Sequence, residues 1–69
     1  MTKLPSSIKI IRILNNHGFL YKSQKGSHQK FINGTKIVIV PANKKQIPLG
    51  TLKSISRQSE IDIDKFLNL

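Results

Sequence analysis

The chain has 69 residues, enough for one small domain over residues 1–69 and too few for a second. It contains no cysteine, which excludes disulfides and thiolate metal sites, so a compact apolar core must stabilise it. The chain has twelve Lys and Arg residues and three acidic residues, Glu60, Asp62 and Asp64, which gives a net charge of +9. Residues 1–59 therefore carry no carboxylate, which favours a polyanionic partner: nucleic acid first, then an anionic membrane or an acidic protein.

Two simpler explanations of the composition can be weighed at once. Solubility or the lysine bias of an AT-rich genome can also raise the positive charge, but genome bias should raise the glutamate content as well.

The longest apolar run, Ile37–Val40, is far too short to span a membrane. Residues 1–5 lack the long apolar segment of a signal peptide. We therefore expect a soluble cytoplasmic protein with no membrane partner.

The first predicted element is a helix that begins after Pro5. Ser6 or Ser7 can cap its start, and Gly18 stands where a left-handed residue would end it. A broad apolar stripe lies between them and predicts one buried helix face. The stripe consists of Ile8, Ile10, Ile11, Ile13 and Leu14.

Three strands are predicted next, over residues 19–25, 28–32 and 35–40. Gly26-Ser27 predicts the first turn. Asn33-Gly34 is a strong signal for a two-residue hairpin into a strand rich in β-branched residues, which Pro41 ends. The core is expected to include Phe19, Phe31, Phe66 and the Ile and Leu residues, and Tyr21, on the same strand face as Phe19, is expected to pack rather than to stack on a base.

The last part of the chain predicts a basic loop and two helices. The loop covers residues 42–48, and a helix follows from residue 49 or 50 to residue 59, with Leu52 and Ile55 facing inward. Asp62 can cap a last short helix. Its apolar residues Phe66, Leu67 and Leu69 are expected to pack back on the domain. The resulting class is α+β: a helix, a three-stranded antiparallel sheet, a helix and a short C-terminal helix, with one sheet face open to solvent.

The open sheet face is where we expect the functional histidine. Side chains alternate across a sheet, so if Phe31 points to the core, then His28, Lys30 and Ile32 point to the uncovered side. An imidazole titrates near neutral pH, and lysines attract phosphate. This combination predicts acid–base chemistry on a nucleic-acid backbone. A neutral imidazole could take the proton of a ribose 2′-hydroxyl, whose oxygen would then attack the adjacent phosphate.

A series of short motifs runs through the chain in a fixed order. They are Leu14, Gly18-Phe19, Gln24-Lys25-Gly26-Ser27-His28, Phe31, Val38-Ile39-Val40-Pro41, Gly50-Thr51-Leu52-Lys53-Ser54-Ile55, Arg57-Gln58 and Phe66-Leu67. In this order and spacing the chain resembles the HicA toxins of bacterial type II toxin–antitoxin systems, which are small ribonucleases that cleave mRNA. The resemblance implies a fold like that of the double-stranded-RNA-binding domain, the same element order that the residues predict by themselves.

The resemblance also implies a mechanism and a partner. It implies RNA cleavage without metal or cofactor, with one essential histidine, which maps onto His28. It further implies inhibition by a HicB antitoxin, encoded beside the toxin, whose partial RNase H-like domain covers the His28 face. We expect the free toxin to be a monomer. The chain departs from the family at Lys22, often apolar there, at Ser23, often arginine, and at Asn43, where a histidine is common.

Candidate substrate-binding residues surround the predicted sheet and the loop after it. They are Lys22, Lys25, Gly26, Ser27, Lys30, Lys36, Lys44 and Lys45. The lysines together would form a phosphate track, and the amides of the Gly-Ser turn could touch a phosphate, although turn geometry alone also explains this glycine. Lys53 and Arg57 are secondary candidates that could instead only offset the acidic tail. His17 suits a helix C-terminus, which is a structural role.

Two rival functions follow from the same residues. The first is a noncatalytic RNA-binding module of the same fold. A His28→Ala variant would distinguish this module from an enzyme, because only an enzyme would lose RNA cleavage. The second is a cationic membrane-active peptide, which the sequence disfavours because its apolar residues are spread over strands rather than along one basic amphipathic helix.

Overall fold

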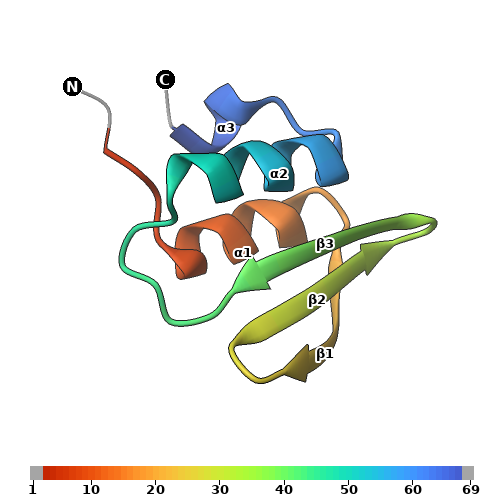
Figure 1. Ribbon diagram of the computed structural model, residues 1–69. Coiled ribbons are helices and arrows are strands. Elements are labelled where there is room, and N and C mark those ends of the chain that lie inside the picture. The colour runs from red at the N-terminus through yellow and green to blue at the C-terminus, as the bar shows by residue number, and fades with distance from the viewer. Residues whose placement is uncertain (1–2, 68–69) are drawn as a thin grey trace.

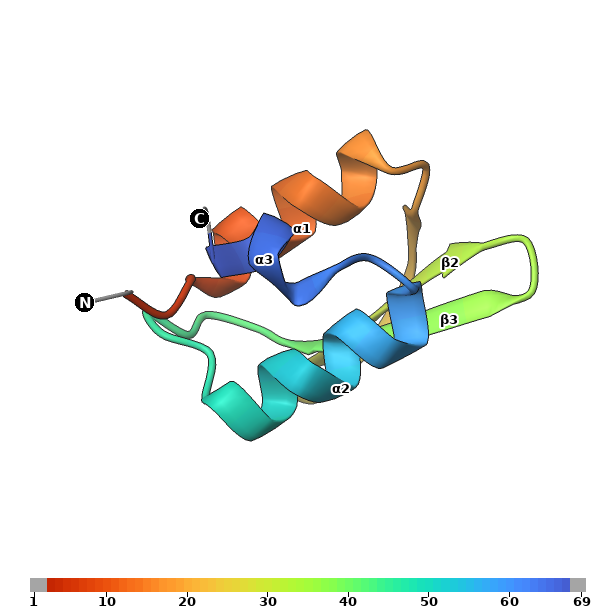
Figure 2. The ribbon, with the colours of Figure 1, turned by 90° about the horizontal axis from the view of Figure 1, so that it is seen from above.

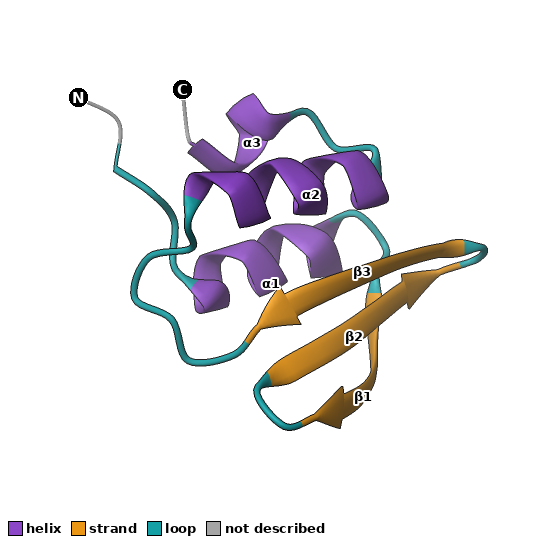
Figure 3. Cartoon of the chain, in the orientation of Figure 1, coloured by secondary structure: helices purple, strands orange, loops and turns teal. Residues whose placement is uncertain are grey.

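The computed structural model describes residues 3–67 and contains three helices and three strands (Figures 1 and 3). The elements are α1 (Ser7–Asn16), β1 (Leu20–Lys25), β2 (His28–Asn33), β3 (Lys36–Pro41), α2 (Leu49–Ser59) and α3 (Ile63–Leu67). The strands form one antiparallel sheet in the order β1-β2-β3. This arrangement confirms the predicted α+β class and element order. The predicted packing of Leu69 lies outside the described residues.

The helices lie on one side of the sheet. Figure 1 shows α1 and α2 above the strands, and Figure 2 shows α3 lying over the space between these two helices, both of which it contacts. Within residues 3–67, the helices are all too short or too polar to cross a membrane.

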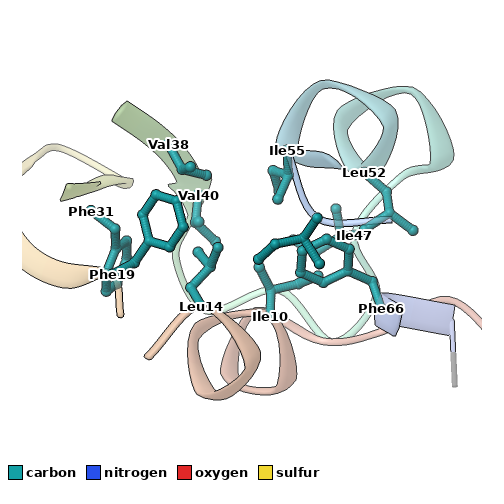
Figure 4. Close-up of a cluster of buried hydrophobic side chains, with 11 residues drawn as sticks. Ile10, Leu14, Phe19, Phe31, Val38, Val40, Ile47, Leu52, Ile55 and Phe66 are labelled. Atoms are coloured by element: carbon teal, nitrogen blue, oxygen red, sulfur yellow. The ribbon is translucent and has the colours of Figure 1, made fainter. Parts of the chain in front are cut away.

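The core fills the space between the helices and the covered sheet face (Figure 4). Every element except β1, which is exposed throughout, contributes to it, as do the residues between elements. Its members are Ile10, Leu14, Phe19, Phe31, Val38, Val40, Ile47, Leu52, Ile55, Ile61 and Phe66. The inward direction predicted for Leu52, Ile55 and Phe31 is thereby confirmed.

The start of α1 is tied to the loop that follows β3. Ser6 caps the helix, as its Oγ accepts a hydrogen bond from the Lys9 amide at 3.1 Å. The buried Ser7 hydroxyl donates to the Pro41 carbonyl at 2.6 Å and accepts from the Lys44 amide at 2.9 Å. Because Pro41 is the Cα partner of the first residue of β2, these bonds connect α1 with the sheet end at His28.

Both hairpins are closed by a two-residue turn that begins with glycine. Gly26 has a φ of +58° and Gly34 a φ of +61°, which is typical of type II′ turns. The prediction that Asn33-Gly34 forms the turn is wrong by one residue: the turn is Gly34-Thr35, and Asn33 pairs with Lys36 inside the ladder. The Asn33 side-chain amide instead donates to the His17 carbonyl at 3.1 Å, at the end of α1.

Tyr21 packs as expected, although its position on β1, at the sheet edge, leaves it partly in solvent. Its ring packs edge-to-face on Phe31, with centroids 5.9 Å apart, but Tyr21 remains 55% exposed. The ladder is regular except for a bulge between Tyr21 and Ser23, which leaves Lys22 without a Cα partner on β2.

Candidate functional site

The face of the sheet turned away from the helices, called here the open sheet face, carries three rows of side chains. Strand register defines them because Cα partners in an antiparallel pair project from the same face. The rows are Lys25, His28 and Pro41; Ser23, Lys30 and Ile39; and Leu20, Ile32 and Ile37. The predicted placement of His28, Lys30 and Ile32 on this face is therefore confirmed.

His28 lies in a hollow on the open sheet face. The hollow has a volume of about 560 Å³, in the range of small-molecule sites, and is lined by Ser23, Lys25, His28, Lys30 and Ile39. The imidazole is exposed, as expected from the sequence. A flexible ligand such as single-stranded RNA can therefore reach the ring directly.

The backbone around His28 is held from both sides. His28 is the first residue of β2, and its Cα partners are Lys25 on β1 and Pro41 on β3. Just before it, the Ser27 carbonyl accepts a hydrogen bond from the Ala42 amide at 2.6 Å. The imidazole thus projects from a fixed point in the sheet, which is what precise positioning of an acid–base group requires.

The hollow is cationic and contains no carboxylate. Lys25 and Lys30 flank the histidine, and none of its lining residues is acidic. The three acids of the chain stand at positions 60, 62 and 64, in and before α3. Among residues 3–67 the sole ion pair joins Lys36 Nζ and Glu60 Oε1, 3.8 Å apart. The charges of Lys25 and Lys30 are therefore free to act on a ligand.

The structure separates the other predicted substrate-binding residues into three groups. Gly26 and Ser27 form the exposed turn next to His28. Lys22 stands at the bulge on the exposed edge strand. Lys36 shares the covered face with Val38 and lies five residues along β3 from Pro41, roughly 17 Å away.

Lys44 and Lys45 belong to the loop after β3. The Lys44 backbone is bound to Ser7, through its amide as described above and through its carbonyl, which accepts from the Ser7 amide at 3.0 Å. Lys45 lines a second hollow, of about 230 Å³, together with Lys3, Lys9 and residues 4–6. Neither lysine lines the hollow at His28, and the roles of all these residues remain predictions.

Two residues of the hollow, Ser23 and Ile39, were not among the predicted site residues. Strict alternation from Tyr21 would place Ser23 and Lys25 on its own face, the covered one. The bulge at Lys22 adds one residue to β1 and turns both side chains toward His28. Ile39 is the Cα partner of Lys30, whereas a turn at Asn33-Gly34 would have paired Lys30 with Ile37, so the predicted hairpin register did not bring Ile39 to the site.

The second histidine stands apart from this hollow. His17 is the C-cap of α1, and its Nδ1 lies 2.9 Å from the Ile13 carbonyl oxygen, in agreement with the predicted structural role. Its carbonyl meets Asn33, at the end of β2 opposite His28, roughly 17 Å along the strand. Lys53 and Arg57 are exposed on α2. Within residues 3–67, His, Asp and Glu nowhere form a group of three that could hold a metal ion.

Comparison with known proteins places the chain in a family. The family model described as HicA toxin of bacterial toxin–antitoxin systems matches residues 8–61, which include all three strands, α2 and all of α1 except its first residue. No curated protein matches the chain. The chain belongs to the HicA toxin family and is a toxin of a toxin–antitoxin system, which implies a cognate antitoxin.

Proposed function

We propose that this HicA family toxin is an endoribonuclease that cleaves mRNA, with His28 as its catalytic residue. The observation that carries the proposal is the exposed imidazole flanked by two lysines that have no acidic partner in the described part of the chain. Phosphodiester cleavage needs a group that can move a proton near neutral pH and cations that stabilise negative charge on phosphate. The hollow holds both. Because the substrate would be mRNA, we place the activity in the cytoplasm.

In the proposed reaction, RNA supplies its own nucleophile. The neutral His28 imidazole takes the proton of a ribose 2′-hydroxyl, and the 2′ oxygen forms a bond to the adjacent phosphorus. The bond from phosphorus to the 5′ oxygen breaks, and that oxygen leaves with a proton from water. The products are a 2′,3′-cyclic phosphate and a 5′-hydroxyl. General base help of this kind contributes about 10²–10⁴-fold to the rate.

The lysines and the turn have a separate part in this proposal. Lys25 and Lys30, on two neighbouring strands, would hold the phosphate beside the imidazole as point charges. Charge grows on the phosphate oxygens as the 2′ oxygen attacks, so cations fixed beside them stabilise the transition state more than the ground state. The Gly26 and Ser27 amides stand close enough in the chain to add donors for the same phosphate.

The second candidate is a noncatalytic RNA-binding module of the same fold. One observation favours it: among the described residues that line the hollow, His28 is the single histidine and none is Asp or Glu, so the imidazole has no second histidine or carboxylate as a partner acid. In such a module the lysines would still bind phosphates, and His28 would be one more exposed polar residue.

Replacing His28 with alanine decides between the two. The variant should cleave RNA at least 10²-fold more slowly while binding it with nearly unchanged affinity. His17→Ala is the matched control, since His17 is also exposed but stands at the end of α1. An RNA with 2′-deoxyribose at the cut site should resist the wild-type protein, and EDTA should have no effect. Equal cleavage by His28→Ala and the parent protein would refute the proposal.

The regulation follows from the same location. We propose that the cognate antitoxin is a HicB protein that covers the His28 face and excludes RNA. We further propose that the free toxin is a monomer, because two chains of net charge +9 repel each other.

A further inference from the structure

The row of the open sheet face farthest from His28 is aliphatic. Leu20, Ile32 and Ile37 are Cα partners across β1, β2 and β3. Leu20 is 68% exposed and Ile37 is 50% exposed, while Ile32 between them is half-buried. We call these three residues the apolar row.

RNA gives no reason for these side chains to be exposed. Phosphates are bound by cations and amides, and unpaired bases stack on aromatic rings rather than on branched aliphatic side chains. Contiguous aliphatic residues left in water on a small protein instead mark a surface that binds protein. The cationic hollow and the apolar row therefore suit different ligands.

The two halves of the face are close enough for one protein to cover both. His28 and Ile32 are four residues apart on β2, about 14 Å along the strand. A standard interface buries about 800 Å² on each partner, which spans more than this distance. The middle row joins the halves, since Lys30 lines the hollow and its neighbour Ile39 continues the aliphatic surface toward Ile37.

Resting on the proposed function, we propose that the apolar row is the part of the open sheet face that distinguishes the cognate antitoxin from RNA. Aliphatic side chains of the antitoxin cover Leu20 and Ile37, while its carboxylates face Lys25 and Lys30. Charge complementarity supports this occupant, because the three rows contain cations and no acid. A second copy of the toxin would instead bring like charges together.

This division predicts that antitoxin binding and RNA cleavage can be separated. RNA and antitoxin compete for the cationic hollow, but the antitoxin alone uses the apolar row. Changes in the row should thus release the toxin from inhibition without harming its activity, whereas changes at Lys25 and Lys30 should weaken binding of both ligands.

The test replaces Leu20 and Ile37 with threonine, singly and together. Threonine favours strands, and both positions are exposed, so the fold should be retained. Ile8→Thr is the matched control, because Ile8, contrary to the burial predicted for the α1 stripe, is an equally exposed aliphatic residue, at 69%, but on α1. Calorimetric titration with the purified antitoxin should show roughly tenfold weaker binding for each change and about 100-fold for the pair. Ile8→Thr should bind like the parent.

The same preparations are assayed for RNA cleavage, which should be unchanged in all variants. Antitoxin affinity unchanged in the pair would overturn the inference. An equal loss of RNA cleavage in the double variant would also overturn it, because the row would then bind RNA. So would a wild-type dimer in sedimentation that the double variant no longer forms, because the row would then serve self-association. Failure of the ribonuclease proposal would look different: the wild-type protein would leave RNA intact in an assay that does not depend on the antitoxin titration.

Discussion

The salt dependence of RNA binding gives the sharpest test of which lysines hold the substrate. Each phosphate contact with a single strand releases counterions and contributes about −0.7 to the slope of log K against log salt concentration. Lys25 and Lys30 line the hollow at His28, and neither has an ion-pair partner among residues 3–67. Replacing each with glutamine should therefore make the slope shallower by about 0.7, and replacing both by about 1.4.

The assay is fluorescence anisotropy with a labelled single-stranded RNA at several salt concentrations. All variants are made in the His28→Ala background, so that the RNA stays intact during the titration. Glutamine keeps much of the lysine stem and removes only the charge, which limits effects on packing.

Lys36→Gln is the matched control because it lowers the net charge by the same amount. Lys36 lies on the covered sheet face and pairs with Glu60, so its loss should leave the slope unchanged. The exposed pair itself is worth little to stability. If Lys36→Gln changed the slope as much as Lys25→Gln does, RNA would respond to net charge alone and the hollow would not be the binding site.

Two further predictions concern the framework around the site. Ser7→Ala removes a buried hydroxyl with two hydrogen bonds and leaves the Lys44 amide without that partner, so it should lower the free energy of unfolding, measured by urea denaturation, by about 2 kcal/mol. Ser6→Ala removes only a helix cap and should lower it by about 1 kcal/mol. Equal losses would contradict the stabilising role of the contact between Ser7 and the loop after β3. An added Cβ meets nothing within 4 Å at Gly34 or at Gly50, so the two positions differ in backbone conformation and not in space. Gly34→Ala should destabilise the protein by about 1 kcal/mol because Gly34 has a φ of +61°, whereas Gly50→Ala in α2 should stabilise it by about 0.5 kcal/mol. Changes of the same sign would show that backbone conformation does not decide the outcome.

The elements of this fold could be predicted because their signals are local. The cap at Ser6, the positive φ of Gly18 and the glycine turns each depend on residues a few positions apart. The burial of Phe31 then determined, by alternation, that His28 faces solvent. One correct core residue on β2 was enough to place the candidate catalytic side chain.

What the sequence did not reveal depends on partners that are distant along the chain. Asn33 pairs with Lys36 inside the ladder, and its side chain donates to the His17 carbonyl at the end of α1 instead of forming part of the hairpin turn. Lys36 meets Glu60, which lies 24 positions further along the chain, and the sequence pattern did not indicate this ion pair. Patterns of neighbouring residues carry no record of such contacts, because the partners are separated by 16 and 24 positions along the chain.

The bulge in β1 shows most clearly how a local irregularity builds the site. Tyr21 and Lys25 are four positions apart, so a regular strand would put both on the same face. The structure needs them on opposite faces: Tyr21 packs on Phe31, whereas Lys25 stands beside His28. One extra residue resolves the conflict, and a charged lysine at that point also discourages pairing of the edge strand with other chains.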